Sequence, residues 1–405
     1  MMKHGFLARS IPIFAALMLS GGCAIHSAAP TDAEWRLPYP LDAKPVENMI
    51  MHVRTGRVLD RSSLMSLLAD ARVVYVAESH DNIESHRVQA EIIREMARRY
   101  PGHLAVGMEM FPESAQPALD RWRASGYNDE EFDRIWTEHW SVDIEYYRPV
   151  IDAIRQFKLP IIALNANKAA VKEVSSKGIA EASGDVDGGL PEIDLTDKYQ
   201  RKFLEAMFED HAKGTGMIDR FVQVQTLWDE TMAENTVNWL QSDPSGENRM
   251  IVMAGGNHIT YGFGIPRRVF RRFPVTYYTV ATEIFSYEHV PEEKMMDVDV
   301  PELPLQPSDF IWYIDYKELE LKRVKLGVRM QPNEGGGIKV VEVLRDSMAE
   351  AAGIRAGDVL TELNGQPLRE PHNLTFRLKS VKPGDTVTIN IVRGGHTGSA
   401  VVNFR

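Results

Sequence analysis

Four short apolar segments, each followed at once by polar or glycine residues, constrain the fold of this chain more than any other feature. Each segment is brief and rich in aliphatic or β-branched residues, which is typical of strands that are buried on both faces. Two further strands are expected at Val275–Val280 and Phe310–Tyr316. The four segments are Val73–Ala77, Leu104–Met108, Ile161–Leu164 and Met250–Ala254.

Segments with helical spacing lie between the four predicted strands. Strands that alternate with helices indicate a mostly parallel sheet with helices on both faces. The sequence therefore predicts an α/β fold for this part of the chain. The expected helices are Ser85–Arg99, Asn128–Trp140, Tyr146–Phe157 and Phe221–Leu240.

Side chains that can carry chemistry follow the predicted strands. The first strand leads into Glu78-Ser79-His80-Asp81, and the second ends at Glu109. Asn165 and Asn167 follow the third strand, and the fourth leads into Gly255-Gly256-Asn257-His258. In open parallel sheets, ligands bind beyond the carboxyl ends of the strands. Two histidines, two carboxylates and two amides are thus expected to converge on one edge of the sheet.

The residues after the first strand differ in what they require. A charged group at the end of a buried strand needs a partner or a chemical role, which singles out Glu78 and His80. Ser79 or Asp81 can simply cap the following helix. His86 is expected on the first helical turn, where it faces back toward the strand ends.

Two glycines precede the second histidine of this set. Gly255 and Gly256 let the backbone approach a ligand closely, which a plain loop would not require. His258 is therefore predicted to belong to the site. Glu109 is favoured as a further member because it ends an apolar strand.

The residues alone leave two kinds of function open. As an enzyme, the chain would use Glu78, His80, Glu109 and His258 as catalytic residues in general-base or metal-assisted hydrolysis of an ester or amide. Glu78, His80 and His258 would hold the divalent metal, and this donor set suits Zn, Mn or Fe without selecting among them. As a binding protein, the chain would hold a ligand at the same edge.

Length and charge narrow the organisation and the partners. A chain of 405 residues is too long for one compact core and suggests two or three domains. A net charge of −11 gives no general attraction to phosphate backbones, so nucleic acid is not an expected partner. The local group Arg267, Arg268, Arg271 and Arg272 is interpreted as a solvated helix face.

The N-terminus has the pattern of a lipoprotein. A short cationic start precedes the apolar run Ile11–Leu19, which is too short to span a bilayer and has the length of a signal-peptide core. Small residues then precede Cys23, the only cysteine, in an arrangement that resembles a lipobox. We expect a signal peptide over residues 1–22, lipidation of Cys23 and an extended tether over residues 23–45. This pattern implies an outer-membrane lipoprotein that faces the periplasm.

The C-terminal part, residues 319–405, has short predicted strands and glycine-rich turns. Its run from Ala352 to Gly365 resembles the PDZ domains of bacterial envelope proteases. In such domains a loop, here Leu326-Gly327-Val328, offers backbone N–H groups to a peptide's terminal carboxylate while the peptide adds a strand to the sheet. The resemblance implies a small β-rich domain that recruits an envelope protein or peptide C-terminus.

The part before it, residues 46–318, resembles the ChaN family of haem-binding lipoproteins, within a superfamily that includes Tiki-type metalloproteases and erythromycin esterases. The matching blocks are Val76–Asp81 with His86 and Gln89, Gly107–Phe111, Gln225–Ala233 and Gly255–Pro266.

This resemblance implies haem binding in iron acquisition or haem handling, and it is compatible with haem shared between two copies of the chain. The superfamily's shared positions correspond here to Glu78, His80, Gly255 and His258, together with Glu109. Expected haem-binding residues are His80, His258 and Tyr261, because haem iron accepts Tyr or His. Tyr261 has an equal alternative as an aromatic that packs over the glycine-rich loop. The metal-dependent hydrolase stays open as the alternative function.

Overall fold

The structure is a computed structural model that describes residues 24–26, 44–182, 189–208, 215–288, 290–291, 294–297 and 303–405. The expected signal peptide, Cys23 and most of the expected tether lie outside these residues. The chain forms two compact units. The larger unit runs to Leu319, and the smaller unit consists of Glu320–Arg405 together with Asn128–Arg134.

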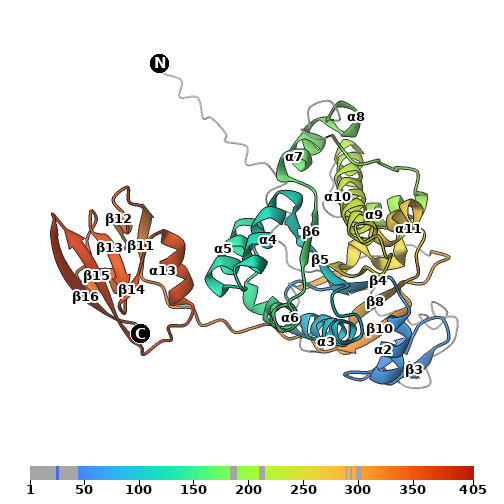
Figure 1. Cartoon of the computed structure of the whole chain (residues 1–405), viewed down its shortest axis with the longest axis horizontal. Helices are drawn as coiled ribbons and strands as arrows, with labels where there is room; N and C mark the ends of the chain where they lie inside the picture. Colours follow the sequence, from blue (N-terminus) through green and yellow to red (C-terminus); the bar gives the residue numbers. More distant parts are fainter. Residues whose placement is uncertain are drawn as a thin grey trace, which may run out of the picture. The chain divides into compact units, whose positions relative to one another are not determined.

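The larger unit is built on an eight-stranded sheet with the order β3-β2-β10-β8-β4-β7-β5-β6 among the described residues (Figure 1). The strands from β10 to β6 run parallel to one another, and β2 and β3 add an antiparallel edge. The predicted α/β fold with a mostly parallel sheet is therefore confirmed. The strands are β2 (Ile50–His52), β3 (Arg57–Leu59), β4 (Val73–Glu78), β5 (Leu104–Pro112), β6 (Ile161–Asn165), β7 (Arg249–Gly255), β8 (Tyr277–Ile284) and β10 (Phe310–Ile314).

The helices of this unit lie between the strands in the chain, as the spacing predicted. They are α2 (Arg61–Ala69), α3 (Ile83–Arg99), α4 (Gln116–Ala124), α5 (Asp129–His139), α6 (Ile144–Phe157), α7 (Lys168–Lys177), α8 (Ile179–Ala182), α9 (Lys198–Phe208), α10 (Thr215–Gln241) and α11 (Ile265–Arg272), with short 3-10 turns η2 (Glu113–Ala115), η3 (Gly256–His258) and η4 (Thr260–Gly262). The first residues of α5, up to Arg134, belong to the smaller unit.

Helices cover both faces of the sheet. Tyr75 of β4 packs in one buried cluster with Met232 of α10 and Val269 of α11. Side chains alternate between faces along a strand, so Glu78 points to the opposite side, where it meets α3 and α6. Helices α3 and α6 pack against each other on that side (Figure 1). The carboxyl end of β4 is thus enclosed by helices from two layers.

A second, two-stranded sheet pairs β1 (Ala24–His26) with β9 (Met295–Asp297) in parallel. No helix in the described part of the chain is both long and apolar enough to cross a bilayer.

The smaller unit is a β-rich domain, as predicted. Its strands follow the order β11-β12-β13-β15-β16, with β14 paired to β13, so β11 lies at one edge of the sheet. Its elements are β11 (Val328–Pro332), β12 (Ile338–Val343), α12 (Met348–Ala351), β13 (Val359–Leu363), β14 (Gln366–Pro367), α13 (Pro371–Leu378), β15 (Thr386–Arg393) and β16 (His396–Asn403).

Candidate functional site

The structure brings Glu78, His80, Glu109 and His258 together at the carboxyl ends of β4, β7 and β5, which are neighbouring strands. Glu78 is level with Gly255 in the β4–β7 pairing, and the backbone N–H of Gly255 donates to Oε2 of Glu109 at 2.7 Å. We call these four residues the edge cluster. The predicted convergence of distant side chains on one edge of the sheet is therefore observed.

Glu78 and His80 form the first half of the edge cluster. Nδ1 of His80 lies 2.7 Å from Oε1 of Glu78, which also accepts a 2.5 Å hydrogen bond from the hydroxyl of Tyr147. Gln89 donates to the other oxygen of Glu78 at 2.6 Å, and Nδ1 of His86 lies 3.7 Å from the same oxygen. The buried carboxylate of Glu78 is thus surrounded by donors, as a charge in a low-dielectric interior requires.

Glu109 and His258 form the second half. Nε2 of His258 lies 3.4 Å from Oε1 of Glu109, and its Nδ1 lies 2.6 Å from Oδ1 of Asp229 on α10. Gln225, one helical turn earlier, lies 3.0 Å from the same Nδ1, and Asp229 also accepts from Gln200 at 2.7 Å. The imidazole is therefore held between two carboxylates.

Charge coupling shifts the pKa values across the edge cluster. Burial by itself would lower the pKa of His258, but the charges of Glu109 and Asp229 outweigh it and raise that pKa to about 10. Burial would raise the pKa of Glu109, but the facing His258 lowers it to about 2. For His80, burial is outweighed by the hydrogen bond with Glu78 and the charge of Glu109, so its pKa is raised.

Glycines allow this close packing, although the close neighbour of Gly255 is the side chain of His80 and not the ligand that the sequence predicted. A Cβ at Gly255 would lie 3.2 Å from Nε2 of His80, which is tighter than an ordinary contact. A Cβ at Gly264 would lie 2.1 Å from the backbone oxygen of His258, so only glycine fits there. Gly256 is different, because a Cβ there would meet its nearest neighbour at an ordinary 3.7 Å.

Other residues near the strand ends have structural partners. His86 faces back as expected, and its Nε2 lies 3.2 Å from the backbone oxygen of His80. Asn82, rather than Ser79 or Asp81, caps α3 by accepting from the backbone N–H of Glu84. The capping prediction was therefore wrong by one position.

The two amides also have structural partners. Asn165 donates to the backbone oxygen of Glu109 at 3.0 Å, whereas Asn167 binds Ser114 and Glu113. The amides thus support the edge without joining the edge cluster.

The metal alternative gains no support from the described residues. Among them, no group of three or more His, Cys, Asp and Glu side chains is arranged to hold a metal ion. The nitrogen Nδ1 of His80 and both ring nitrogens of His258 face carboxylates instead.

Residues that sequence reasoning assigned no role complete the edge cluster. Asp229 and Gln225 lie four positions apart on α10 and reach the same ring nitrogen, and Tyr147 reaches Glu78 from α6. The spacing of two polar residues on one face of an apolar helix was the available signal for the first two. Nothing in the local sequence of Tyr147 marks it.

Tyr261 lies apart from the edge cluster, in a groove of about 520 Å³ that we call the aromatic groove. Its ring lies 5.7 Å from that of Phe203 and 5.4 Å from that of Phe263. Its backbone is in the left-handed region, with φ 58°, which is unfavourable for a residue with a bulky side chain. The aromatic residues that line the groove are Tyr199, Tyr261, Phe263, Phe270 and Tyr277.

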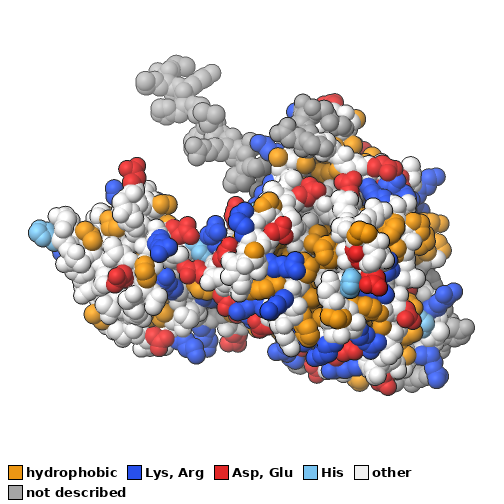
Figure 2. All heavy atoms as spheres, in the orientation of Figure 1, with side chains coloured by type: hydrophobic (Ala, Val, Ile, Leu, Met, Phe, Trp, Pro, Cys, Tyr) orange, Lys and Arg blue, Asp and Glu red, His pale blue; other side chains and the backbone are white. Residues whose placement is uncertain are grey.

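The aromatic groove combines exposed apolar surface with positive charge. Tyr199 is 47% exposed and Phe270 is 48% exposed, and hydrophobic side chains are visible on the surface of the larger unit in Figure 2. Lys198 and Arg267 contribute cations and Asp197 an anion, and Arg267 pairs with Asp194 at 2.8 Å and with Asp197 at 3.6 Å. The aromatic groove is therefore a candidate site for a ligand that has both apolar and anionic parts.

The expected solvated face of α11 is only partly correct. Arg268 is fully buried, and its Nε lies 3.1 Å from Oε1 of Glu230. Arg272 pairs with the same carboxylate at 2.5 Å. These arginines therefore anchor α11 to α10 instead of facing solvent.

In the smaller unit, the loop predicted to bind a carboxylate precedes the edge strand β11. Gly327 has a φ of 81°, and a Cβ there would lie 2.3 Å from Cβ of Ser347. The backbone oxygens of Leu326 and Gly327 accept from Ala349 and Leu344. Val328 then begins β11. These two backbone hydrogen bonds therefore fix the conformation of the loop.

Comparison with known proteins agrees with this organisation. The family described as haem-binding uptake, Tiki superfamily, ChaN, matches residues 64–269, and the PDZ domain family matches residues 324–404. The solved structure described as cofacial haem binding to ChaN of Campylobacter jejuni shares the fold, with a TM-score of 0.52 and 16% identity, over 69% of this chain and 100% of that one.

Curated relatives match over shorter regions. A probable periplasmic serine endoprotease of Rhizobium meliloti, DegP-like, is 37% identical over 90 residues, which are 20% of this chain and 18% of the relative. The periplasmic endoprotease DegQ of Escherichia coli is 24% identical over 44% of this chain and 33% of its own length. The chain thus spans a third or less of these relatives. On the family matches, the chain belongs to the ChaN family of haem-binding uptake proteins in the Tiki superfamily and carries a C-terminal PDZ domain.

Proposed function

We propose that the larger unit binds haem in the aromatic groove, with Tyr261 as the ligand of the iron. The observation that carries this proposal is a groove of about 520 Å³ in which aromatic side chains, a tyrosine hydroxyl and two cationic side chains occur together. Haem needs flat apolar walls, one or two iron ligands and cations for its carboxylates, so the residues present fit the group.

The backbone of Tyr261 adds independent support. A left-handed conformation costs free energy for a residue other than glycine, and such residues cluster at ligand sites. Arg267 and Lys198 are the candidates to meet the propionates, because charged hydrogen bonds to carboxylates are strong.

His80 and His258, the other predicted haem-binding residues, are less suited to this role. They do not line the aromatic groove. Both ring nitrogens of His258 lie near carboxylates, and the residue is only 7% exposed. We therefore assign the iron to Tyr261.

A haem titration of the full chain, followed by its Soret band, tests this proposal. We expect saturable binding by the wild-type chain, a shifted Soret band and weaker binding for Tyr261→Phe, and an unchanged spectrum for the matched control Tyr199→Phe. No saturable binding by the wild-type chain would rule out the proposed function. A Soret band that moves in His80→Ala or His258→Ala but not in Tyr261→Phe would reassign the ligand.

Hydrolysis of an ester or amide is the second candidate function, and one observation favours it. Each imidazole of the edge cluster is paired with a carboxylate, His80 with Glu78 at 2.7 Å and His258 with Asp229 at 2.6 Å. A carboxylate that orients an imidazole is part of an acid–base site. His258, whose pKa is raised to about 10, would hold a proton near neutral pH and act there as an acid, which leaves His80 as the candidate base. Turnover of a p-nitrophenyl ester by the wild type that is lost in both His80→Ala and His258→Ala would support hydrolysis. Rates in both variants that equal the wild-type rate would exclude it.

For the whole protein, we propose an outer-membrane lipoprotein that faces the periplasm and acts in iron acquisition or haem handling. The periplasmic names of the relatives that match the PDZ region support the compartment. The open edge of β11 supports recruitment of a peptide C-terminus by strand addition. The exposed apolar side chains of the aromatic groove would be covered if two copies pair. Palmitate labelling that is abolished in Cys23→Ala tests the lipid anchor.

A further inference from the structure

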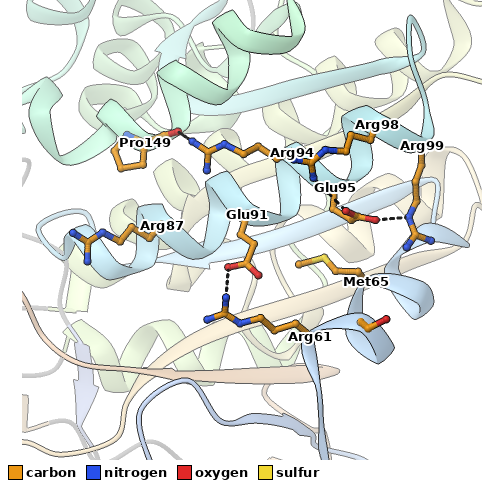
Figure 3. A pocket seen from close by; sticks show the side chains of 10 residues that line it. Arg61, Met65, Arg87, Glu91, Arg94, Glu95, Arg98, Arg99 and Pro149 are labelled. Carbon is orange, nitrogen blue, oxygen red and sulfur yellow. Dashed lines mark hydrogen bonds and ion pairs between the residues drawn. The ribbon is translucent and has the colours of Figure 1, made fainter.

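A second groove, of about 540 Å³, lies between α2 and α3 and is rich in arginine (Figure 3). We call it the arginine groove. Five arginines and two glutamates line it, which leaves a formal charge of +3 in a chain whose net charge is −11. The arginines are Arg61 of α2 and Arg87, Arg94, Arg98 and Arg99 of α3.

The sequence of α3 places these charges on one face. Arg87, Glu91, Arg94 and Arg98 follow one another at intervals of three or four residues, which is the spacing of side chains on the same side of a helix. At 1.5 Å per residue, the row from Arg87 to Arg99 is about 18 Å long. The opposite face of α3 is buried against the sheet and α6.

Two of the guanidinium groups are fixed by other elements. Arg61 pairs with Glu91 across the groove at 3.2 Å, donates to Asn48 and lies 5.3 Å from the ring centre of Trp312. Arg94 donates through Nη2 to the backbone oxygen of Pro149 in α6 at 3.2 Å. Groups that are already held in place lose less conformational entropy when they bind a ligand.

The remaining hydrogen-bonding capacity of these arginines is large. A guanidinium carries five N–H donors, and each of Arg87, Arg94, Arg98 and Arg99 has one nitrogen bonded to protein among the described residues. Arg87 and Arg98 are more than half exposed. Their exposed pairs with glutamate are weak, so an anion with more charge can replace them.

We propose that the arginine groove binds a compact anion that carries two or more phosphate groups. The planar fork of arginine matches phosphate in two-point hydrogen bonds, and a row of forks requires more than one such group. A compact anion is favoured over a membrane surface because Glu91 and Glu95 lie between the arginines and would repel a continuous layer of anionic headgroups. The arginine groove shares no residue with the aromatic groove, so it is a separate site.

Calorimetric titration of the full chain with inorganic tripolyphosphate tests the proposal. We expect saturable binding with one tripolyphosphate per chain, weakened by added salt. Arg94→Gln should weaken binding about tenfold, since one charged hydrogen-bonding group is lost. Arg94→Lys keeps the positive charge but loses the planar fork of the guanidinium. Its affinity for tripolyphosphate should lie between those of the wild type and Arg94→Gln. Arg121→Gln on α4, an exposed arginine outside the groove, is the matched control and should bind like the wild type.

The contrary results are equally specific. Absence of saturable tripolyphosphate binding, or equal weakening in Arg94→Gln and Arg121→Gln, would overturn the proposal. So would binding to phosphatidylglycerol vesicles that needs Arg94 but is not reduced by tripolyphosphate, because the groove would then serve a membrane. Thermal unfolding checks the fold of each variant. If Arg94→Gln is unfolded, the exposed pair Arg87→Gln and Arg98→Gln replaces it with the same expectation.

Discussion

Nδ1 of the buried His258 lies 2.6 Å from Oδ1 of Asp229, so a carboxylate from α10 holds the ring on the side opposite Glu109. Asp229 has no exposed surface and is itself bonded by Gln200. A buried charge with two charged neighbours is a unit in which each member depends on the others. The predictions for the edge cluster follow from this relationship.

Asp229→Asn should destabilise the chain and lower the pKa of His258, because the ring loses one of its two negative neighbours. We expect a loss of about 1–3 kcal/mol in the free energy of unfolding, the usual range for one partner of a buried polar pair. Urea unfolding measures the stability, and NMR of the imidazole nitrogens measures the pKa.

Asp219→Asn on the same helix is the matched control. Its carboxylate pairs with Arg201 at an exposed site, so its removal should change stability by less than about 1 kcal/mol. Equal losses in the two variants would show that burial of Asp229 contributes nothing.

The pair of His258 and Glu109 should make stability depend on pH in two windows. The pKa of His258 is raised from 6.5 to about 10 in the folded state, so its contribution is complete below pH 6.5 and is lost as the pH rises toward 10. The pKa of Glu109 is lowered from 4.5 to about 2, so its contribution is complete above pH 4.5 and is lost as the pH falls toward 2.

The contribution of this pair to the urea midpoint should therefore be highest between pH 4.5 and 6.5. In His258→Asn the fall between pH 6.5 and 10 should become shallower, because the titrating ring is gone. An unchanged slope in that variant would mean that other groups cause the alkaline fall.

Gly255→Ala should displace the ring of His80, whereas Gly256→Ala should be nearly neutral. The added Cβ would lie 3.2 Å from Nε2 of His80 in the first variant and 3.7 Å from Oγ1 of Thr260 in the second. Relief of a contact that is too close costs about 1–3 kcal/mol in a well-packed interior. Unfolding free energies and the NMR signals of His80 distinguish the two. Equal behaviour of the two glycine variants would contradict the packing described for His80.

The edge cluster could be predicted from the sequence because the pattern that marks its residues is local. Each member lies within a few residues of the end of a predicted apolar segment, and parallel strands bring their carboxyl ends to one edge. The second strand does not end at Glu109 as predicted, because β5 continues to Pro112. Glu78, Glu109 and His258 could therefore be placed without knowledge of the strand order. Their partners could not, since Asp229 and Tyr147 lie within helices, and the side of a helix that reaches a given strand end depends on tertiary packing.

The exact ends of a strand and the burial of a charged helix residue could not be predicted from the local sequence pattern. The strand predicted at Val275–Val280 is Tyr277–Ile284 in the structure, because its pairing with β4 and β10 sets the register. Arg268 was interpreted as solvated and is buried, since Glu230 of α10 supplies the partner that its charge requires. Both facts depend on residues distant in the sequence.

The PDZ loop allows a test that separates carboxylate binding from general stability. In Gly327→Ala the added Cβ would lie 2.3 Å from Cβ of Ser347, at a backbone φ of 81° that alanine adopts only with strain. The loop must then move, and its N–H groups lose their alignment. Gly335→Ala is the matched control, because the nearest atom to its Cβ is the flexible side-chain end of Asn333 at 3.4 Å.

Fluorescence anisotropy with a decapeptide that ends in a free valine carboxylate measures binding. We expect binding by the wild type and Gly335→Ala, a loss of about tenfold or more in Gly327→Ala, and no binding of the C-terminally amidated peptide. Equal affinity for the amidated peptide would mean that Leu326-Gly327-Val328 does not recognise a terminal carboxylate, because amidation changes only that group, which loses its charge and one acceptor oxygen.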